Sequence, residues 1–184
     1  MTETLITTSF ETPVGPMQAI ASGRGLCALE FCRPERSALL NARLQRWFPG
    51  ATLIAGTSPF LTQAKAWLDT YFSADFARLR DVTLDPRGTE FELSVWKQML
   101  RLSPGKTISY GELATRLRNP NGSRAVGNAS RRNPIALIVP CHRVVGSNGG
   151  LTGYGGGLNQ KEWLLEHEAV ASPEGQRRKQ KLLV

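Results

Sequence analysis

A cysteine and a histidine stand next to each other in the segment Pro-Cys-His-Arg, as Cys141 and His142. A thiolate is a strong nucleophile, and an imidazole nearby can accept the proton of the thiol. The apolar run at 135–139 ends at Pro140, which predicts a buried strand that delivers the pair at its end. These residues allow nucleophilic chemistry at Cys141, although a lone cysteine beside an apolar strand is more often an inert core residue, so further residues are needed to decide.

The other cysteines do not suggest a second site. The chain has three cysteines, too few and too odd in number for a disulfide framework, which favours a reducing compartment. Cys27 and Cys32 lack a second cysteine pair, and the only histidines are His142 and His167, so we expect no zinc. No apolar stretch approaches the length that spans a bilayer, and the N-terminus lacks a signal-peptide pattern. The expected location is cytoplasmic, with no membrane partner.

The positive charge of the chain lies mainly in its second half. The net charge is +8, and residues 1–88 hold nine basic and eight acidic side chains, whereas residues 89–184 hold fourteen and seven. A long stretch without any acid suits a phosphate backbone, although a solvated basic face has the same composition. The basic residues of this acid-free stretch are Arg116, Arg118, Arg124, Arg131, Arg132, Arg143 and Lys161.

The first half predicts a small antiparallel sheet covered by two helices. Short apolar segments separated by turn residues predict strands at 5–10, 17–21 and 26–31. Apolar residues at helical spacing predict helices around 40–48 and 60–71. Nothing in this half gathers acids, histidines or a phosphate-binding glycine loop, so we interpret it as a supporting domain.

The second half predicts a helix-turn-helix with small side chains. Capping boxes at 89–92 and 109–112 should begin two helices, and Ser123 is the predicted N-cap of a third helix over 124–130. This last helix has little side-chain bulk for reading base edges in a major groove. Small residues instead let a backbone approach a minor groove closely, or let a helix pack tightly on its neighbour. Its small residues are Ala125, Gly127, Ala129 and Ser130.

The second half resembles the O6-alkylguanine-DNA alkyltransferase family. The resemblance lies in RAVGNASRRNPIALIVPCHRVVGSNGGLTGYGGG and KEWLLEHE, with SPGKTISYGELA and FELSVWK upstream, so it covers 89–169. The first half matches loosely through TPVGP. The resemblance implies an α/β (α+β) fold, with a ribonuclease H-like sheet-and-helix domain packed on a mainly helical domain that contains the helix-turn-helix. We expect these domains at 1–86 and 87–171, followed by a disordered basic tail at 172–184.

The resemblance also implies roles for the residues around Cys141. Cys141 is the expected nucleophile and alkyl acceptor, and because a free cysteine is mostly protonated at pH 7, it needs a base. His142 is implied as that base, acting through a bridging water, with Glu168 orienting its other ring nitrogen. Adjacent side chains on an extended segment point in opposite directions, so we expect no direct hydrogen bond from Cys141 to His142. Asn133 is implied as the residue that ties the helix to the site.

An alkylated base cannot be reached while it is stacked, so the resemblance implies that the protein extrudes it from the duplex. Arg124 is expected to fill the vacated space, and Tyr110 to press on the phosphate and donate to the base; without the resemblance, these are a phosphate-binding arginine and a core tyrosine. Further DNA contacts are expected from Ala125, Gly127, Ala129 and Ser130. The expected pocket includes Val144, Tyr154, Gly155, Gly156 and Lys161.

The expected function is a stoichiometric, irreversible transfer of an alkyl group from O6-alkylguanine in double-stranded DNA to Cys141. No cofactor and no obligate protein partner are expected, and alkylated thymine stays open as a second substrate. Three alternatives remain. A module that only recognises alkylated DNA would lack the reactive cysteine, and a thiol hydrolase with the same three residues would not need the acid-free arginine stretch. A helix-turn-helix regulator would need longer side chains on its second helix.

Overall fold

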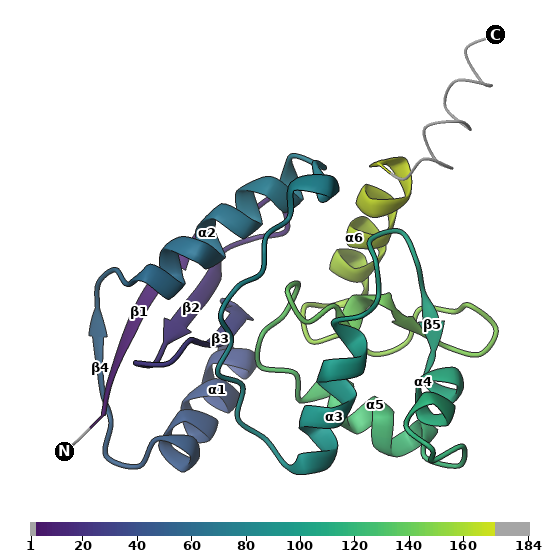
Figure 1. Cartoon of the computed structure of the whole chain (residues 1–184), viewed down its shortest axis with the longest axis horizontal. Helices are drawn as coiled ribbons and strands as arrows, with labels where there is room; N and C mark the ends of the chain where they lie inside the picture. The colour runs from purple at the N-terminus through teal and green to yellow at the C-terminus, as the bar shows by residue number, and fades with distance from the viewer. Residues whose placement is uncertain (1–2, 172–184) are drawn as a thin grey trace, which may run out of the picture. The chain divides into compact units, whose positions relative to one another are not determined.

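The chain folds into two compact units. The computed structural model describes residues 3–171, so the predicted tail at 172–184 lies outside the described residues. The first unit comprises Met1–Ser73, Ala77–Gly88 and Pro134–Ala136, and the second comprises Ala74–Phe76, Thr89–Asn133 and Leu137–Val184 (Figure 1). The short segment Pro134–Ala136 therefore belongs to the first unit, although the residues on both sides of it belong to the second.

The first unit is built on a four-stranded sheet with the order β3-β2-β1-β4. β1 (Thr4–Phe10), β2 (Met17–Ala21) and β3 (Leu26–Phe31) pair antiparallel, which confirms the three predicted strands. β4 (Thr52–Ala55) pairs parallel with β1, so the sheet is mixed and not purely antiparallel as predicted. The sequence prediction missed β4 because its four residues are all exposed and show no alternation of apolar and polar side chains.

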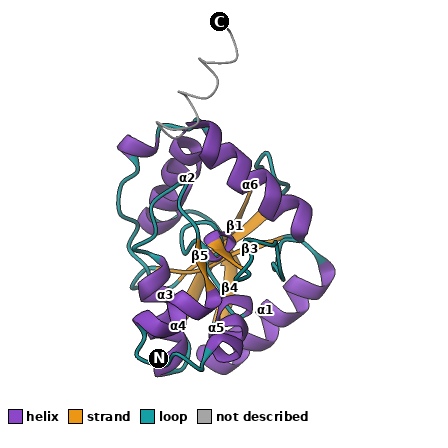
Figure 2. Cartoon of the chain, turned by 90° about the vertical axis from the view of Figure 1, so that its right-hand side faces the viewer, coloured by secondary structure: helices purple, strands orange, loops and turns teal. Residues whose placement is uncertain are grey.

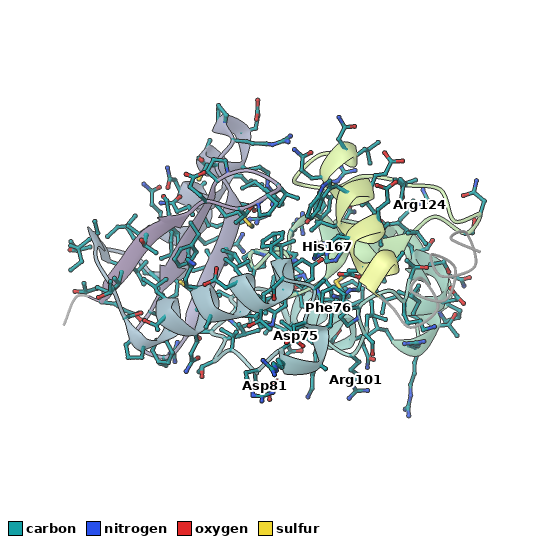
Figure 3. The ribbon with its side chains drawn as sticks, turned by 90° about the horizontal axis from the view of Figure 1, so that it is seen from above. Asp75, Phe76, Asp81, Arg101, Arg124 and His167 are labelled. Carbon is teal, nitrogen blue, oxygen red and sulfur yellow. The ribbon has the colours of Figure 1, made fainter. Side chains whose placement is uncertain are left out.

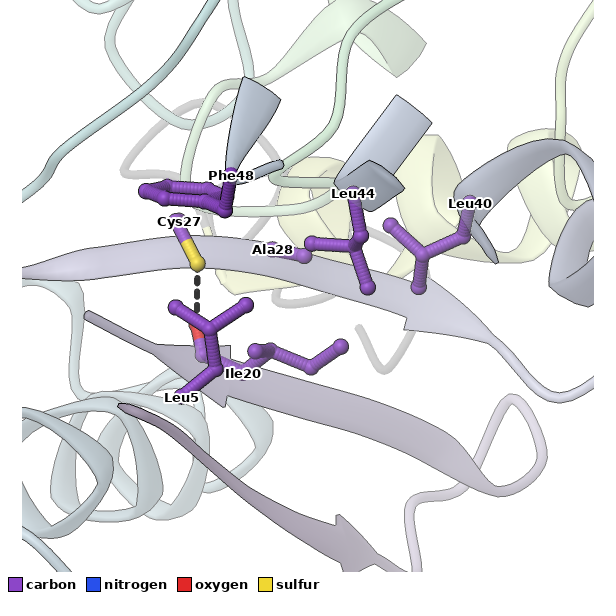
Figure 4. Close-up of a cluster of buried hydrophobic side chains, with 7 residues drawn as sticks. All are labelled: Leu5, Ile20, Cys27, Ala28, Leu40, Leu44 and Phe48. Carbon is purple, nitrogen blue, oxygen red and sulfur yellow. Dashed lines mark hydrogen bonds between the residues drawn. The ribbon is translucent and has the colours of Figure 1, made fainter. Parts of the chain in front are cut away.

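Two helices cover the two faces of this sheet, as predicted. α1 (Pro34–Trp47) and α2 (Pro59–Phe72) lie on opposite sides of it (Figure 1). α1 closes over a cluster of buried side chains in which the Cys27 thiol donates to the Ile20 carbonyl at 3.3 Å (Figure 4). Burial raises the pKa of Cys27 to about 12, so this thiol is an unreactive core group.

The apolar run at 135–139 is buried, but it is not a strand. Ile135 forms a single parallel bridge with Leu29 at the edge of β3, where the Leu29 backbone makes two hydrogen bonds to the neighbours of Ile135 (2.9 and 2.8 Å). The chain then turns, and Leu137 has a positive φ of 69°. The prediction was wrong because a continuous apolar run indicates burial without indicating the direction of the backbone.

The second unit is mainly helical (Figure 2). Its first segment ends at Phe76, which is also the first residue of η1 (Phe76–Arg78), a turn of 3₁₀ helix. Its helices are α3 (Glu90–Met99), α4 (Tyr110–Arg116), α5 (Ser123–Arg131) and α6 (Leu158–Ala171). Between α5 and α6 lies a second 3₁₀ turn, η2 (Cys141–Arg143), and the strands β5 (Ile108–Ser109) and β6 (Val144–Val145) form a short parallel pair. The fold class predicted from the sequence is confirmed.

The predicted capping boxes begin α3 and α4. The Thr89 and Ser109 hydroxyls each accept from the N–H three residues later (3.2 and 3.1 Å), and the glutamate there accepts from the N–H of the cap (2.9 and 2.8 Å). α5 begins one residue earlier than predicted, because Gly122 and not Ser123 occupies the cap, without a side-chain hydrogen bond. α4 and α5 pack together and form the helix, turn, helix arrangement. Within residues 3–171, no helix combines the length and apolar character needed to cross a membrane.

Candidate active site

Cys141 lies in a turn of 3₁₀ helix and not at the end of a strand. Its N–H donates to the Val139 carbonyl (2.8 Å), and the Arg143 N–H donates to the Pro140 carbonyl (3.0 Å). The side chains of η2 are all buried, with Cys141 8 % exposed and His142 fully enclosed. The premise that Cys141 and His142 lie on an extended segment was therefore wrong, because both lie in a turn of 3₁₀ helix.

The Asn133 side chain holds the turn that carries Cys141. Its Nδ2 donates to the Val139 carbonyl (2.7 Å) and to the Cys141 Sγ (3.1 Å). A donor on sulfur favours the thiolate over the thiol, because the charged form is the better acceptor. Asn133 is itself buried and lies two residues after α5 ends, so the end of this helix and the sulfur are linked by one side chain.

His142 and Glu168 form a fully buried pair. His142 Nε2 lies 2.8 Å from Glu168 Oε1. Burial lowers the pKa of His142, so the imidazole is neutral at pH 7. Because a carboxylate only accepts hydrogen bonds, Nε2 carries the proton and Nδ1 carries the lone pair. Nδ1 is buried and has no hydrogen-bond partner among the residues that the structure describes, which leaves it able to accept a proton.

Arg143 and one backbone N–H donate further hydrogen bonds to the two oxygens of the Glu168 carboxylate. Arg143 donates through Nε to both oxygens (3.1 and 3.0 Å) and through Nη2 to Oε1 (2.8 Å), while the Gly105 N–H donates to Oε2 (2.9 Å). Burial alone would raise the pKa of Glu168, but the hydrogen bonds from His142 and Arg143 and the charge of Arg143 outweigh it and hold the pKa well below its usual range. Glu168 is therefore a fixed anion, and it fixes the His142 ring in turn.

The structure corrects the interpretation of Arg143 as a phosphate-binding residue. Arg143 and Lys161 are buried, so neither reaches a phosphate on a bound duplex. Arg132 is exposed, but its Nη1 donates to Glu92 Oε1 (3.1 Å), an acid outside the acid-free stretch. Sequence reasoning missed the pair of Arg143 and Glu168 because 25 residues separate the two partners and no local pattern relates them.

Lys161 is a buried cation that binds backbone carbonyls. Its Nζ donates to the carbonyls of Val144 (2.6 Å) and Thr152 (2.9 Å), and the Tyr110 hydroxyl lies at a longer 3.4 Å from the same Thr152 carbonyl. Burial lowers the pKa of Lys161 and raises that of Tyr110. Lys161 thus joins β6 to the glycine-rich loop that follows it, and Tyr110 lies at the same junction.

The glycine-rich loop places an aromatic ring next to His142. The ring of Tyr154 meets that of His142 edge to face, with centroids 6.3 Å apart. Gly157 has a φ of 99°, a conformation that side chains with a Cβ rarely adopt, so the loop requires glycine there. Gly155 and Gly156 form the turn directly after Tyr154.

α5 borders an open groove of about 410 Å³. Three of the residues predicted to contact DNA or the base line it, namely Tyr110, Arg124 and Gly127, whereas Ala129 and Ser130 are buried and do not. Ala125 is exposed on α5 outside this lining. Arg131, one of the basic residues of the acid-free stretch, lines the groove as well. The remaining lining residues, which the sequence analysis did not assign to DNA binding, are Ser123, Asn128, Thr152 and Gly153. The groove is thus formed by α5, the start of α4 and the loop held by Lys161.

The second histidine of the chain belongs to an aromatic stack. The His167 ring stacks on Trp163 (centroids 5.0 Å apart) and meets the edge of Phe76 (5.7 Å). Figure 3 shows His167 beside Phe76, with Arg124 apart from both. His167 therefore packs against two aromatic rings of this unit.

Comparison with known proteins identifies the family. Residues 5–86 match the 6-O-methylguanine DNA methyltransferase ribonuclease-like domain, and residues 90–170 match the DNA-binding domain of the same family. A methylated-DNA--protein-cysteine methyltransferase of Methanosarcina mazei is 42% identical over 159 residues, which cover 86% of this chain and 94% of that protein. Its counterpart in Mycobacterium bovis is 40% identical over 167 residues, covering 90% and 93%.

Solved structures agree with this assignment. The crystal structure of Mycobacterium tuberculosis OGT in complex with DNA is similar with a TM-score of 0.75 and 38% identity, over 94% of this chain and 97% of that one. An archaeal O6-methylguanine-DNA methyltransferase from Pyrococcus kodakaraensis gives a TM-score of 0.63 and 31% identity, over 89% and 98%. The chain therefore belongs to the methylated-DNA--protein-cysteine methyltransferase family.

Proposed function

We propose that this protein repairs DNA by moving an alkyl group from the O6 atom of a damaged guanine to Cys141. One arrangement supports the proposal. The Asn133 amide donates to the Cys141 sulfur, and a neutral His142 is held by the Glu168 carboxylate, both of whose oxygens accept hydrogen bonds. This arrangement stabilises a thiolate at a fixed position and offers a lone pair on His142 Nδ1 for its proton.

The reaction is a single displacement at carbon. The thiol proton passes to His142 Nδ1 through a bridging water, and the Cys141 sulfur then forms a bond to the alkyl carbon as the bond from carbon to O6 breaks. The electron pair of the broken bond stays on guanine, where the Tyr110 hydroxyl donates to N3. The product is a thioether, and water does not cleave its carbon–sulfur bond at neutral pH. Each protein molecule therefore reacts once.

The proposed mode of DNA binding uses the groove along α5. Gly127 lies near the Tyr110 ring without side-chain bulk of its own, so a backbone or a flipped nucleotide can approach closely there. Arg124 is exposed at the N-terminal end of α5, where it can enter the space that an extruded base leaves. These features support minor-groove binding with base extrusion.

Replacing Arg124 with alanine should slow repair of a duplex while sparing a free base. Unstacking a base costs a few kcal/mol, so losing the residue that fills the gap should slow transfer from duplex O6-methylguanine by about 10- to 100-fold. The reaction with free O6-benzylguanine should change little, because it involves no extrusion. Single-turnover rates with both substrates measure this, with Arg46→Ala, an exposed arginine on α1 outside the acid-free stretch, as the control. Equal losses with both substrates would place Arg124 in some other role.

Replacing Gly155 with serine should narrow the range of alkyl groups accepted. Gly155 lies in the turn after Tyr154, and a side chain there would take space from groups larger than methyl. We expect the ratio of benzyl to methyl transfer rates to fall by about tenfold, because the two heavy atoms of the serine side chain would narrow a tight pocket. Both rates are measured on the same variant, so a general loss of activity cancels. An unchanged ratio would reject the idea.

The test of the proposed function follows the alkyl group itself. Purified protein is mixed with duplex DNA that carries one radiolabelled O6-methylguanine, and the label is located by peptide mass spectrometry. We expect one methyl group per protein on Cys141 and none in Cys141→Ala. Label that stays on the DNA despite tight binding would identify a recognition module without transfer, and the mechanism above would be wrong.

A further inference from the structure

The end of α5 is held by two side chains of α3. The indole Nε1 of Trp96 donates to the Ala129 carbonyl (2.9 Å), and Glu92 accepts from Arg132 (3.1 Å). Glu92 and Trp96 are four residues apart and so lie on one face of α3, while Ala129 lies in the last turn of α5 and Arg132 caps its C-terminal end. Two neighbouring side chains of α3 therefore hold the C-terminal end of α5.

These contacts lie at the end of a helix, where the last carbonyls lack the N–H four residues later that they would accept from in the helix interior. The Ala129 carbonyl accepts instead from the Arg132 N–H (3.2 Å) and from the Trp96 indole (2.9 Å). The Asn133 N–H donates to the Ser130 carbonyl (3.1 Å), so Asn133 directly continues the C-terminal end of α5. Asn133, whose amide reaches the Cys141 sulfur, directly follows Arg132 in the chain.

We propose that Trp96 and Glu92 are positioning residues that set the Asn133 amide on the sulfur of Cys141. Trp96 is buried, at 2 % exposure, and its single polar side-chain atom donates to α5. The side chain therefore fixes the position of α5 along the axis of α5, as well as filling the core. Moving the last turn of α5 by a fraction of an ångström lengthens the bond from Asn133 to sulfur, and the thiolate loses its donor. The proposal depends on the proposed function only in taking Cys141 as the nucleophile.

The test measures the Cys141 thiolate without any DNA. The rate of Cys141 alkylation by iodoacetamide is followed against pH by peptide mass spectrometry, which separates Cys141 from the exposed Cys32 and the buried Cys27. Trp96→Phe keeps an aromatic ring and removes the N–H donor together with part of the ring system. We expect the pH of half-maximal reactivity to rise by about 0.5, the effect of weakening one hydrogen bond to the charged form. Trp163→Phe on α6 is the matched control, with no expected change.

Two further variants make the inference decisive. Glu92→Gln preserves a capping group but removes the charge that holds Arg132, and it should shift the profile in the same direction even if Trp96→Phe fails to fold. In an Asn133→Ser background, Trp96→Phe should produce no additional shift, because the residue through which it acts is gone. The inference is wrong if both α3 variants leave the profile of Cys141 unchanged, or if the shift persists without Asn133. A loss of stability alone would show a merely structural role, whatever the outcome of the methyl-transfer assay.

Discussion

Replacing Glu168 with glutamine is expected to slow methyl transfer by about 100- to 10,000-fold, the range for losing an oriented general base. In the native site the carboxylate can only accept, so the His142 proton stays on Nε2 and Nδ1 is free to take the thiol proton. The amide of glutamine can turn its NH₂ group toward Nε2. That ring nitrogen then becomes the acceptor, the proton moves to Nδ1, and the base is lost. Single-turnover transfer from duplex O6-methylguanine measures the effect.

DNA binding should separate this effect from a general loss of structure. Glu168 is fully buried and is not among the residues that line the α5 groove, so the affinity of Glu168→Gln for a duplex should stay within about twofold of the native value. Glu166→Gln, on the exposed side of the same helix, is the control and should react at the native rate. A Glu168→Gln protein that binds DNA and transfers methyl at the native rate would show that the carboxylate does not set the tautomer of His142.

The elements that position this site were predictable where their signals are local. The capping boxes at Thr89 and Ser109 fix where α3 and α4 begin, because each uses residues three positions apart. The helical spacing of apolar residues likewise predicted α1 and α2. The turn through Leu137 was not predictable, because leucine rarely adopts a positive φ and no residue type at this position indicates one.

The chemistry of the site was predictable only in part, for the same physical reason. The adjacent Cys141 and His142 indicate a nucleophile and a base, but Glu168 was named through the family resemblance and not through any spacing. Arg143 shows the limit most clearly, because a charge count places it with the DNA-binding arginines while the fold encloses it against a distant carboxylate. A basic residue in a sequence can therefore be assigned to DNA binding only once the structure shows whether its side chain is exposed.

Replacing Arg143 with methionine is expected to lower the free energy of unfolding by about 3–5 kcal/mol, because it leaves Glu168 as a buried anion without its cation. Two of its donors would remain, His142 Nε2 and the Gly105 N–H, which places the expected loss toward the lower end of that range. Urea unfolding followed by far-UV circular dichroism measures it, and Arg116→Met, an exposed arginine on α4, should change stability by less than about 0.5 kcal/mol.

The combination of Arg143→Met with Glu168→Gln distinguishes a paired charge from simple packing. Removing both charges leaves no uncompensated ion, so the double variant should be more stable than Arg143→Met alone, even though it carries one more substitution. The double variant should also transfer methyl as slowly as Glu168→Gln, because the His142 proton is still on the wrong nitrogen. That result would separate the stability of the pair from its role in the reaction. A double variant that loses the sum of the two single losses would show that Arg143 stabilises the fold through its contact with the Leu102 carbonyl and its packing, and not through the charge of Glu168.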